Sequence, residues 1–304
     1  MKNLLTIISI SIFLFSCSEK KTVSSGLEGV WKKIGTTIYK DGKPSDTLSP
    51  MYDRTNKKDR EGYQYKIYSK EHISWIRRIN NLDSAGNNLS YGTGASGTYE
   101  VRNDSLFEIL KLGVDRWKEI FTEGRVFKFA LNVNQNNFEQ FRIDDQGNGF
   151  GELYERIDTY NQSNFLSGVY QRDANLVYEK NKVVDTLRNF LTRYSDFSMK
   201  LILTDNFYSL IWNYELLDSL GNDTNDARMI LANATYENNK QYLSLVGGFK
   251  PITDQWRDKF DNKRDRDIEL TKENNLLLGL LGGNNSGSLD ENGNGRRSLF
   301  KRIE

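Results

Sequence analysis

Apolar and polar side chains alternate with a period of two along most of the chain beyond residue 26. The clearest alternating segments are rich in β-branched and aromatic residues and cover residues 63–79, 98–110, 127–133 and 138–143. Clusters of Gly, Asn and Asp interrupt the alternation at 83–87 and 147–149. Such residues accept the positive φ angles of hairpin turns at little cost. Because successive side chains of a strand point to opposite faces of a sheet, the pattern predicts an all-β, antiparallel structure.

Long helical periodicity is absent from the sequence beyond residue 17. Residues 115–121 fit one or two helical turns, with Trp117 and Phe121 four positions apart on one face. The same residues fit the end of a strand equally well.

The first 16 residues have a different character. Lys2 precedes an apolar run from Leu4 to Phe15, which is shorter than the roughly 20 residues of a transmembrane helix. This is the pattern of a secretory signal peptide. Residues 14–17, LFSC, resemble the lipobox of bacterial lipoproteins, with Phe15 bulkier than is usual at its position. The resemblance implies cleavage before Cys17, the only Cys in the chain, and lipid attachment to it.

Lipidation would place the protein at a membrane surface. Multiple acyl chains give stable anchoring, at about 0.8 kcal/mol per buried CH₂. Ser18, where some lipoproteins carry Asp, favours the outer membrane by the same resemblance. Residues 18–25 are polar and predict a short tether. We therefore expect a lipid-anchored protein of the bacterial cell envelope, with a soluble body held near the membrane.

The body is one sequence unit present twice. Residues 27–31, 39 and 46–48 recur as residues 166–170, 178 and 185–187, all at an offset of 139. Residues 82–87, 98–100 and 115–121 match residues 217–222, 235–237 and 254–260. The copies close with LYERID at 153–158 and LFKRIE at 299–304. Matches in the same order predict a tandem duplication, with domains at 26–158 and 165–304 and a linker at 159–164.

Composition excludes several classes of function. The formal net charge of +1 argues against a nucleic-acid-binding protein, which needs a basic face. One His excludes His-rich zinc sites, and one Cys excludes an intrachain disulfide. The chain has neither a Walker loop nor a Gly-rich dinucleotide motif. We expect no cofactor, no metal and no enzymatic activity.

The candidate residues for catalysis have simpler interpretations. His72 lies within a predicted strand, and its counterpart in the second copy is Phe207, which could not serve in acid–base chemistry. The best-placed carboxylate pairs are Asp115 with Glu119 and Asp254 with Asp258. Lys and Arg are interleaved with them, which indicates a solvated polar face. The Asp-rich turns DDQGNG and DENGNG resemble fragments of calcium loops, but they lack the later bidentate Glu and predict hairpin turns.

Aromatic residues are the remaining candidates for a ligand-binding site. They are Trp75, Trp117 and Phe121 in the first copy, and Trp212, Trp256 and Phe260 in the second. These rings either line a cavity for a ligand or fill the interior as core. The pattern Asp-x-Trp-[Lys/Arg]-[Glu/Asp]-x-Phe recurs in both copies around Trp117 and Trp256, which makes these two the stronger candidates.

Each copy opens with Gly-x-aromatic and closes with Arg-Ile. The pairs are Trp31 with Arg156 and Tyr170 with Arg302. In this the chain resembles lipocalin-like lipoproteins of bacteria. The resemblance implies two tandem up-and-down β-barrels of about eight strands, in which the Arg of the last strand lies over the aromatic ring of the first. Such a cation–π contact contributes roughly 0.5–2 kcal/mol, and phenol is a poorer partner than indole. We expect the contact to close one end of each barrel and a ligand to use the other.

Two classes of function remain. In the first, the barrels bind a small apolar or amphipathic molecule, because an eight-stranded barrel can enclose one small ligand. In the second, the barrels are filled and serve as a docking scaffold for envelope proteins. The lipocalin resemblance supports the first class. The low hydrophobic content, 37%, supports the second, since it leaves little for both a core and a large apolar cavity. We expect ligand binding, with the docking scaffold as the alternative.

Overall fold

The protein is built from β-strands. The computed structural model describes residues 26–82, 88–114, 124–161, 166–188, 194–217, 223–250, 255–257, 264–279, 281–282, 285–286 and 289–304. Every regular element within these ranges is a strand, as the alternating pattern predicts. No helix in the described part of the chain is long and apolar enough to cross a lipid bilayer.

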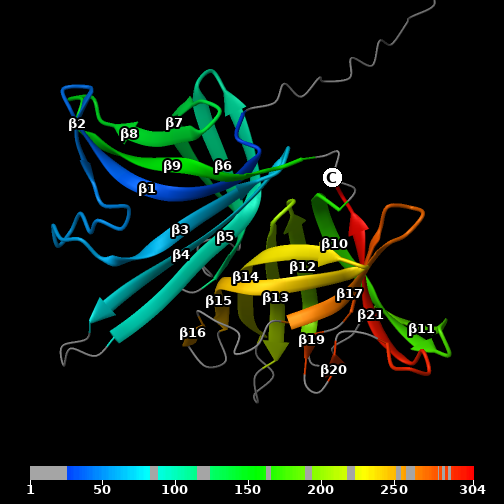
Figure 1. The fold of residues 1–304 in the computed structure, drawn as a ribbon. Coiled ribbons are helices and arrows are strands. Elements are labelled where there is room, and N and C mark those ends of the chain that lie inside the picture. The colour runs from blue at the N-terminus through cyan, green and yellow to red at the C-terminus, as the bar shows by residue number, and fades with distance from the viewer. Residues whose placement is uncertain are drawn as a thin grey trace, which may run out of the picture.

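The first copy forms a closed antiparallel barrel, called barrel 1 (Figure 1). Its strands are β1 (Gly29–Lys40), β2 (Lys43–Leu48), β3 (Glu61–Tyr68), β4 (His72–Leu82), β5 (Asn88–Arg102), β6 (Ser105–Val114), β7 (Arg125–Val133), β8 (Asn137–Ile143) and β9 (Gly149–Thr159). Each strand from β3 to β9 pairs with the next, and β9 pairs back with β1 along most of its length. The hairpin strand β2 continues the sheet beyond this ring of eight by pairing with the second half of β1.

The second copy repeats this topology in barrel 2. Its strands are β10 (Gly168–Glu179), β11 (Lys182–Leu187), β12 (Tyr194–Leu203), β13 (Phe207–Leu217), β14 (Asp223–Glu237), β15 (Lys240–Lys250), β16 (Gln255–Arg257), β17 (Arg264–Leu270), β18 (Leu276–Gly279) and β21 (Gly295–Arg302). Strand β21 pairs with β10 and closes the ring, while β16 is a short addition to β15. The two-residue strands β19 (Leu281–Gly282) and β20 (Asn285–Ser286) form a separate pair. Two tandem barrels are thus confirmed.

Strand registers define which residues of the two copies are equivalent. Trp31 pairs with Arg156, and Tyr170 pairs with Arg302, so the sequence match at the first and last strands is confirmed. In contrast, Thr98 pairs with His72, whereas Asn233 pairs with Phe207. The match of residues 98–100 with 235–237 is therefore wrong by two positions. The hairpins between β5 and β6 and between β14 and β15 fix this register. A match of three similar residues in the sequence does not establish which positions are equivalent.

The two barrels pack against each other through the outer faces of their strands. Ten buried apolar residues form this interface, among them three equivalent pairs: Val30 and Val169, Ile67 and Ile202, Ile76 and Ile211. Close approach is allowed at Gly94, since a Cβ there would lie 2.3 Å from the Met229 sulfur of barrel 2. The outer faces of β1, β3 and β4 thus contribute the buried apolar residues Val30, Ile67 and Ile76 to this interface.

Carboxylates at the C-terminal end of each barrel bind a turn of the other. Asp158 accepts hydrogen bonds from the Thr204 hydroxyl (2.7 Å) and the Asn206 backbone N–H (3.1 Å) in the turn between β12 and β13. Glu304, its counterpart, accepts from Ser69 (2.8 Å) and from the Lys70 N–H (2.6 Å) between β3 and β4. The exchange is reciprocal, as in a two-fold symmetric dimer.

Candidate ligand-binding site

One end of barrel 1 is closed by the first and last strands. The Arg156 guanidinium lies over the Trp31 ring, 4.0 Å from its centroid, as the sequence predicts. Arg156 also donates hydrogen bonds to the backbone carbonyls of Gly26 (2.6 Å) and Glu28. Gly29 has a φ of +141°, and a Cβ there would lie 2.5 Å from the Asp158 carbonyl oxygen. The Gly of the Gly-x-Trp pattern is therefore needed for this close approach.

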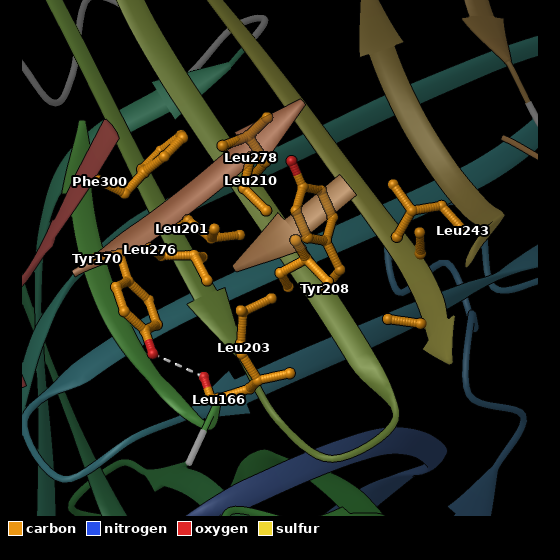
Figure 2. Packing of buried hydrophobic residues seen from close by; sticks show 13 residues of the cluster. Leu166, Tyr170, Leu201, Leu203, Tyr208, Leu210, Leu243, Leu276, Leu278 and Phe300 are labelled. Carbon is orange, nitrogen blue, oxygen red and sulfur yellow. Dashed lines mark hydrogen bonds between the residues drawn. The ribbon is translucent and has the colours of Figure 1, made fainter. Parts of the chain in front are cut away.

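Barrel 2 closes in the same way with a different ring. The Arg302 guanidinium lies 5.7 Å from the centroid of the Tyr170 ring, a longer contact than in barrel 1. The Tyr170 hydroxyl donates to the Leu166 carbonyl at 2.9 Å (Figure 2), just as the Trp31 indole N–H donates to the Leu27 carbonyl at 2.6 Å. The Tyr170 hydroxyl thus takes the place of the indole N–H as the hydrogen-bond donor to the equivalent carbonyl of barrel 2.

A cavity of about 640 Å³ occupies the other half of barrel 1. Trp75, Phe127 and Phe129 form an aromatic wall, and Tyr52, Arg54 and Phe150 lie near its mouth. The turn between β8 and β9, with Asp144, also lines it. The lining residues Phe150, Gly151 and Glu152 lie in the first half of β9, away from Arg156, so the cavity lies toward the end opposite the closed one.

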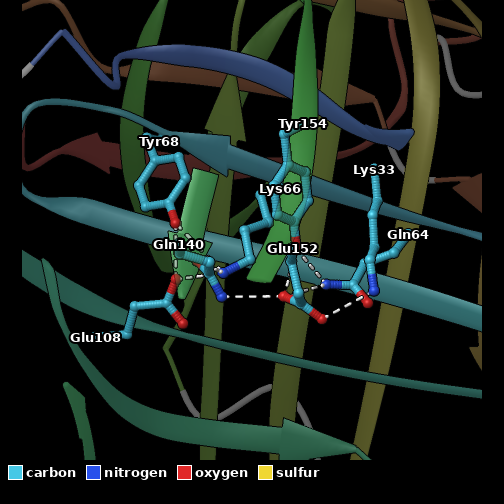
Figure 3. Close-up of polar contacts among 8 residues, drawn as sticks. All are labelled: Lys33, Gln64, Lys66, Tyr68, Glu108, Gln140, Glu152 and Tyr154. Carbon is cyan, nitrogen blue, oxygen red and sulfur yellow. Dashed lines mark hydrogen bonds and ion pairs between the residues drawn. The ribbon is translucent and has the colours of Figure 1, made fainter. Parts of the chain in front are cut away.

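A buried polar network (Figure 3) contributes six residues to the lining of this cavity and forms its floor. It consists of Lys33, Gln64, Lys66, Tyr68, Glu108, Gln140, Glu152 and Tyr154. The Lys66 ammonium group is paired with the Glu108 carboxylate and donates to the Gln140 side-chain oxygen at 2.6 Å. The Tyr68 hydroxyl donates to Glu108 at 2.7 Å. Lys66 and Glu108 are only 2% and 3% exposed. Each buried charge is therefore stabilised by the other, and removing one would leave the second without its partner.

Glu152 is the second acidic centre of the network. Its carboxylate accepts hydrogen bonds from Lys33 (3.1 Å) and Tyr154 (2.8 Å). Burial raises the pKa of Glu152, but the ammonium groups of Lys33 and Lys66 outweigh this effect and hold that pKa well below its ordinary value. Burial, and then the Glu152 carboxylate, raise the pKa of Tyr154. The carboxylate therefore stays ionised and the phenol stays a donor.

Barrel 2 has lost this network. The registers place Arg172, Met199, Leu201, Leu203, Leu243, Leu278, Ser298 and Phe300 at the eight equivalent positions. Six of these are apolar. Leu201, Leu203, Leu243 and Leu278 belong to one buried cluster of leucine and aromatic side chains (Figure 2). At these six positions the described interior of barrel 2 is apolar core, while Arg172 and Ser298 stand where barrel 1 has Lys33 and Glu152.

The aromatic candidates fall into three groups. Trp75 lines the cavity of barrel 1, which supports its assignment to a ligand site. Trp212 packs against the apolar core of barrel 2 and belongs to that core. Trp256 lies in β16, paired with Phe249 of β15, and its side chain is not among those described. Trp117, Phe121, Phe260 and Cys17 lie outside the described residues.

The candidates for chemistry have structural roles where they are described. The His72 ring nitrogen Nδ1 lies 2.9 Å from the Glu304 carboxylate and belongs to the interface between the barrels. Asp144 and Asp290 each accept backbone N–H bonds from residues two and four positions later, which makes DDQGNG and DENGNG hairpin turns. Asp115, Glu119, Asp254 and Asp258 lie outside the described residues. Within the described ranges no cluster of three potential metal ligands occurs.

Sequence analysis did not identify the polar network. A usable signal was present in the repeat: Lys66 and Glu108 are charged in one copy, and Leu201 and Leu243 stand in the other. When two residues of opposite charge in one copy are both leucine in the other, the two charged residues are expected to form a buried pair. Recognising this pair requires the correct register of β5 and β6, and the match of residues 98–100 with 235–237 gives a different one.

Comparison with known proteins adds no family to this description. No protein family, no curated protein and no solved structure matches the chain. The class of protein is therefore defined by its fold, a tandem pair of eight-stranded antiparallel barrels.

Proposed function

We propose that the protein binds a small amphipathic molecule inside barrel 1. The observation that carries this proposal is the cavity of about 640 Å³, which lies in the range of about 300–1,000 Å³ typical of small-molecule sites. Trp75 and Phe129 offer apolar surface, and the buried network below them offers hydrogen-bonding groups. A ligand with an apolar body and a polar group matches both surfaces.

The second class of function, a filled scaffold, describes barrel 2 better than barrel 1. Leu201, Leu243 and Leu278 replace the network residues there and pack into one cluster. Barrel 2 then serves to support barrel 1, since their outer faces bury each other's apolar residues. Binding and scaffold roles are divided between the two copies.

The lipid anchor belongs to the same proposal. The lipobox at residues 14–17 supports attachment of Cys17 to the outer membrane of a bacterial envelope. Eleven residues lie between Cys17 and Gly29, the first residue of β1. At about 3.3–3.6 Å per residue they reach at most roughly 40 Å. Barrel 1 would thus collect its ligand close to the membrane.

Binding of N-phenyl-1-naphthylamine, a neutral fluorescent probe, to the full chain tests this function. We expect saturable binding that Trp75→Ala weakens about tenfold, in the range of a lost aromatic contact, and that Trp75→Phe largely restores. Trp212→Ala, the same substitution at a tryptophan of barrel 2, should leave the affinity unchanged. Thermal unfolding of each variant separates lost binding from lost fold. Loss of binding in Trp212→Ala but not in Trp75→Ala, or no binding of any probe, would contradict the proposal.

A further inference from the structure

The cavity of barrel 1 carries an excess of positive charge. Its lining includes the basic residues Lys33, Arg54, Lys66, Arg77 and Arg142, against the acidic residues Glu108, Asp144 and Glu152. Five cationic groups thus face three carboxylates. Low-dielectric walls strengthen the field inside a cleft, so this excess attracts an anion more strongly than the same charges would on an open surface.

The three carboxylates are already engaged by the protein. Glu108 is paired with Lys66, and Glu152 is paired with Lys33. Asp144 accepts the backbone N–H groups of its own turn, at 3.0 Å and 2.8 Å. The excess positive charge therefore comes from the arginines Arg54, Arg77 and Arg142.

Two further features show that the cavity favours a hydrogen-bonding anion. Burial lowers the pKa of Lys33, the Glu152 carboxylate opposes this, and the guanidinium groups of Arg77 and Arg54 lower it further. The guanidinium groups of Arg77 and Arg54 thus act on the same ammonium group. Thr36 is 4% exposed and lines the cavity, and its hydroxyl has no hydrogen-bond partner among the described residues. A buried hydroxyl without a partner is costly unless a ligand or water completes it.

Aromatic rings lie next to the arginines. The Arg142 guanidinium lies 4.4 Å from the Phe129 ring centroid, and the Arg54 guanidinium lies 4.6 Å from that of Phe150. Trp75 and Phe127 continue the apolar wall. A flat ligand body would thus lie against rings while its charged group meets guanidinium groups, which favour carboxylate, sulfonate and phosphate oxygens.

We propose that the ligand of barrel 1 is a small aromatic anion, with its acidic group held by Arg77 and Arg54 near Lys33 and Thr36 and its rings against Trp75 and Phe129. This inference rests on the proposed function and names the chemical class of its ligand.

A pair of probes that differ only in charge tests the inference on the full chain. 1-Anilinonaphthalene-8-sulfonate carries a sulfonate on the same ring system as the neutral N-phenyl-1-naphthylamine. We expect the sulfonate to bind about tenfold more tightly, and this preference to shrink as salt is added. Equal binding of the two probes, or tighter binding of the neutral one, overturns the inference and leaves the proposed function standing. If neither probe binds, both are wrong.

Charge-removing variants locate the anion. Arg77→Gln should reduce sulfonate affinity about tenfold and leave the neutral probe nearly unaffected. Arg78→Gln removes the same charge from the next position of β4, on the opposite face, and should change neither. Arg54 is exposed, so Arg54→Gln keeps the fold and should also weaken the sulfonate, whereas Lys57→Gln in the same loop should not. Equal effects of target and control variants would show surface attraction only and overturn the inference.

A competition experiment tests whether the apolar part of the ligand is aromatic. 2-Naphthoate should displace the bound sulfonate probe, and laurate should not, because only the former is flat and aromatic. Displacement by laurate but not by 2-naphthoate would indicate a lipid acid and overturn the aromatic part of the inference.

Discussion

Ser74 of barrel 1 and Ser209 of barrel 2 meet across the interface, with their hydroxyl oxygens 2.9 Å apart. The two serines are the same position of the repeat, and both are nearly fully buried. A residue that contacts its own counterpart lies at a two-fold axis. The duplication has thus produced an internal dimer, whose halves share apolar residues and exchange the carboxylates of Asp158 and Glu304.

The shared interface should make the protein unfold as one unit. Ile76 and Ile211 are buried in it, so Ile76→Asp places a charge in an apolar contact and should separate the barrels without entering either interior. We expect one cooperative urea transition for the native chain and two for the variant. Lys32→Asp, an exposed change on β1, is the control and should keep a single transition. A single transition for Ile76→Asp would contradict the role assigned to this interface.

The closed end of barrel 1 predicts an order of stability losses. Trp31 is fully buried, so Trp31→Ala should cost about 3–5 kcal/mol of unfolding free energy. Arg156→Ala should cost less, because part of its guanidinium is exposed. Tyr170→Trp would keep the ring contact and should be tolerated better than Tyr170→Ala. Urea denaturation measures all four, and a larger loss for Arg156→Ala than for Trp31→Ala would refute this order.

The buried pair of Lys66 and Glu108 should be strongly coupled. Lys66→Leu alone leaves the Glu108 carboxylate buried without its ammonium partner and should cost about 3–5 kcal/mol. The double variant Lys66→Leu with Glu108→Leu reproduces the residues of barrel 2 and should be more stable than either single variant. A double-mutant cycle by urea denaturation measures the coupling. Additive losses would mean that the two charges do not depend on each other.

Acid should weaken the contact between the barrels. Burial raises the pKa of Glu304, but hydrogen bonds from His72, Lys70 and Ser69 outweigh it and lower that pKa below its ordinary value of 4.5. A lowered pKa in the folded state contributes stability that is fully present above about pH 4.5 and is lost as the pH falls through the folded value. Unfolding free energy measured from pH 7 to pH 3 should therefore fall in the acid range. Glu304→Gln should flatten part of this fall, while Glu71→Gln, an exposed neighbour, should not.

The predicted anchor is testable by fractionation. Cys17→Ser removes the thiol that the lipobox resemblance assigns to lipid attachment. The variant should leave the membrane fraction and appear in the soluble envelope fraction. Retention of the variant in the membrane pellet would contradict the anchor.

Sequence reasoning about the candidate site succeeded in part. The contact of Arg156 with Trp31 is confirmed, and Trp75, one of the candidate residues, lines the cavity of barrel 1. It did not find Lys66 and Glu108, which are 42 residues apart in the chain and meet only inside the closed barrel. Contacts across a barrel interior depend on strand register, and register is a property of the whole sheet.

The sequence alone determined the strands, the turns, the duplication and the pairing of first with last strand. Alternation and turn chemistry act over a few residues, and a repeat is visible without any structure. Tertiary structure decided which face of each strand is the interior. On β3 the charged Lys66 points into barrel 1, while the apolar Ile67 points out and is buried by barrel 2. The alternating pattern defines two faces of a strand but does not say which one points into the barrel. On β3 both faces are covered by protein.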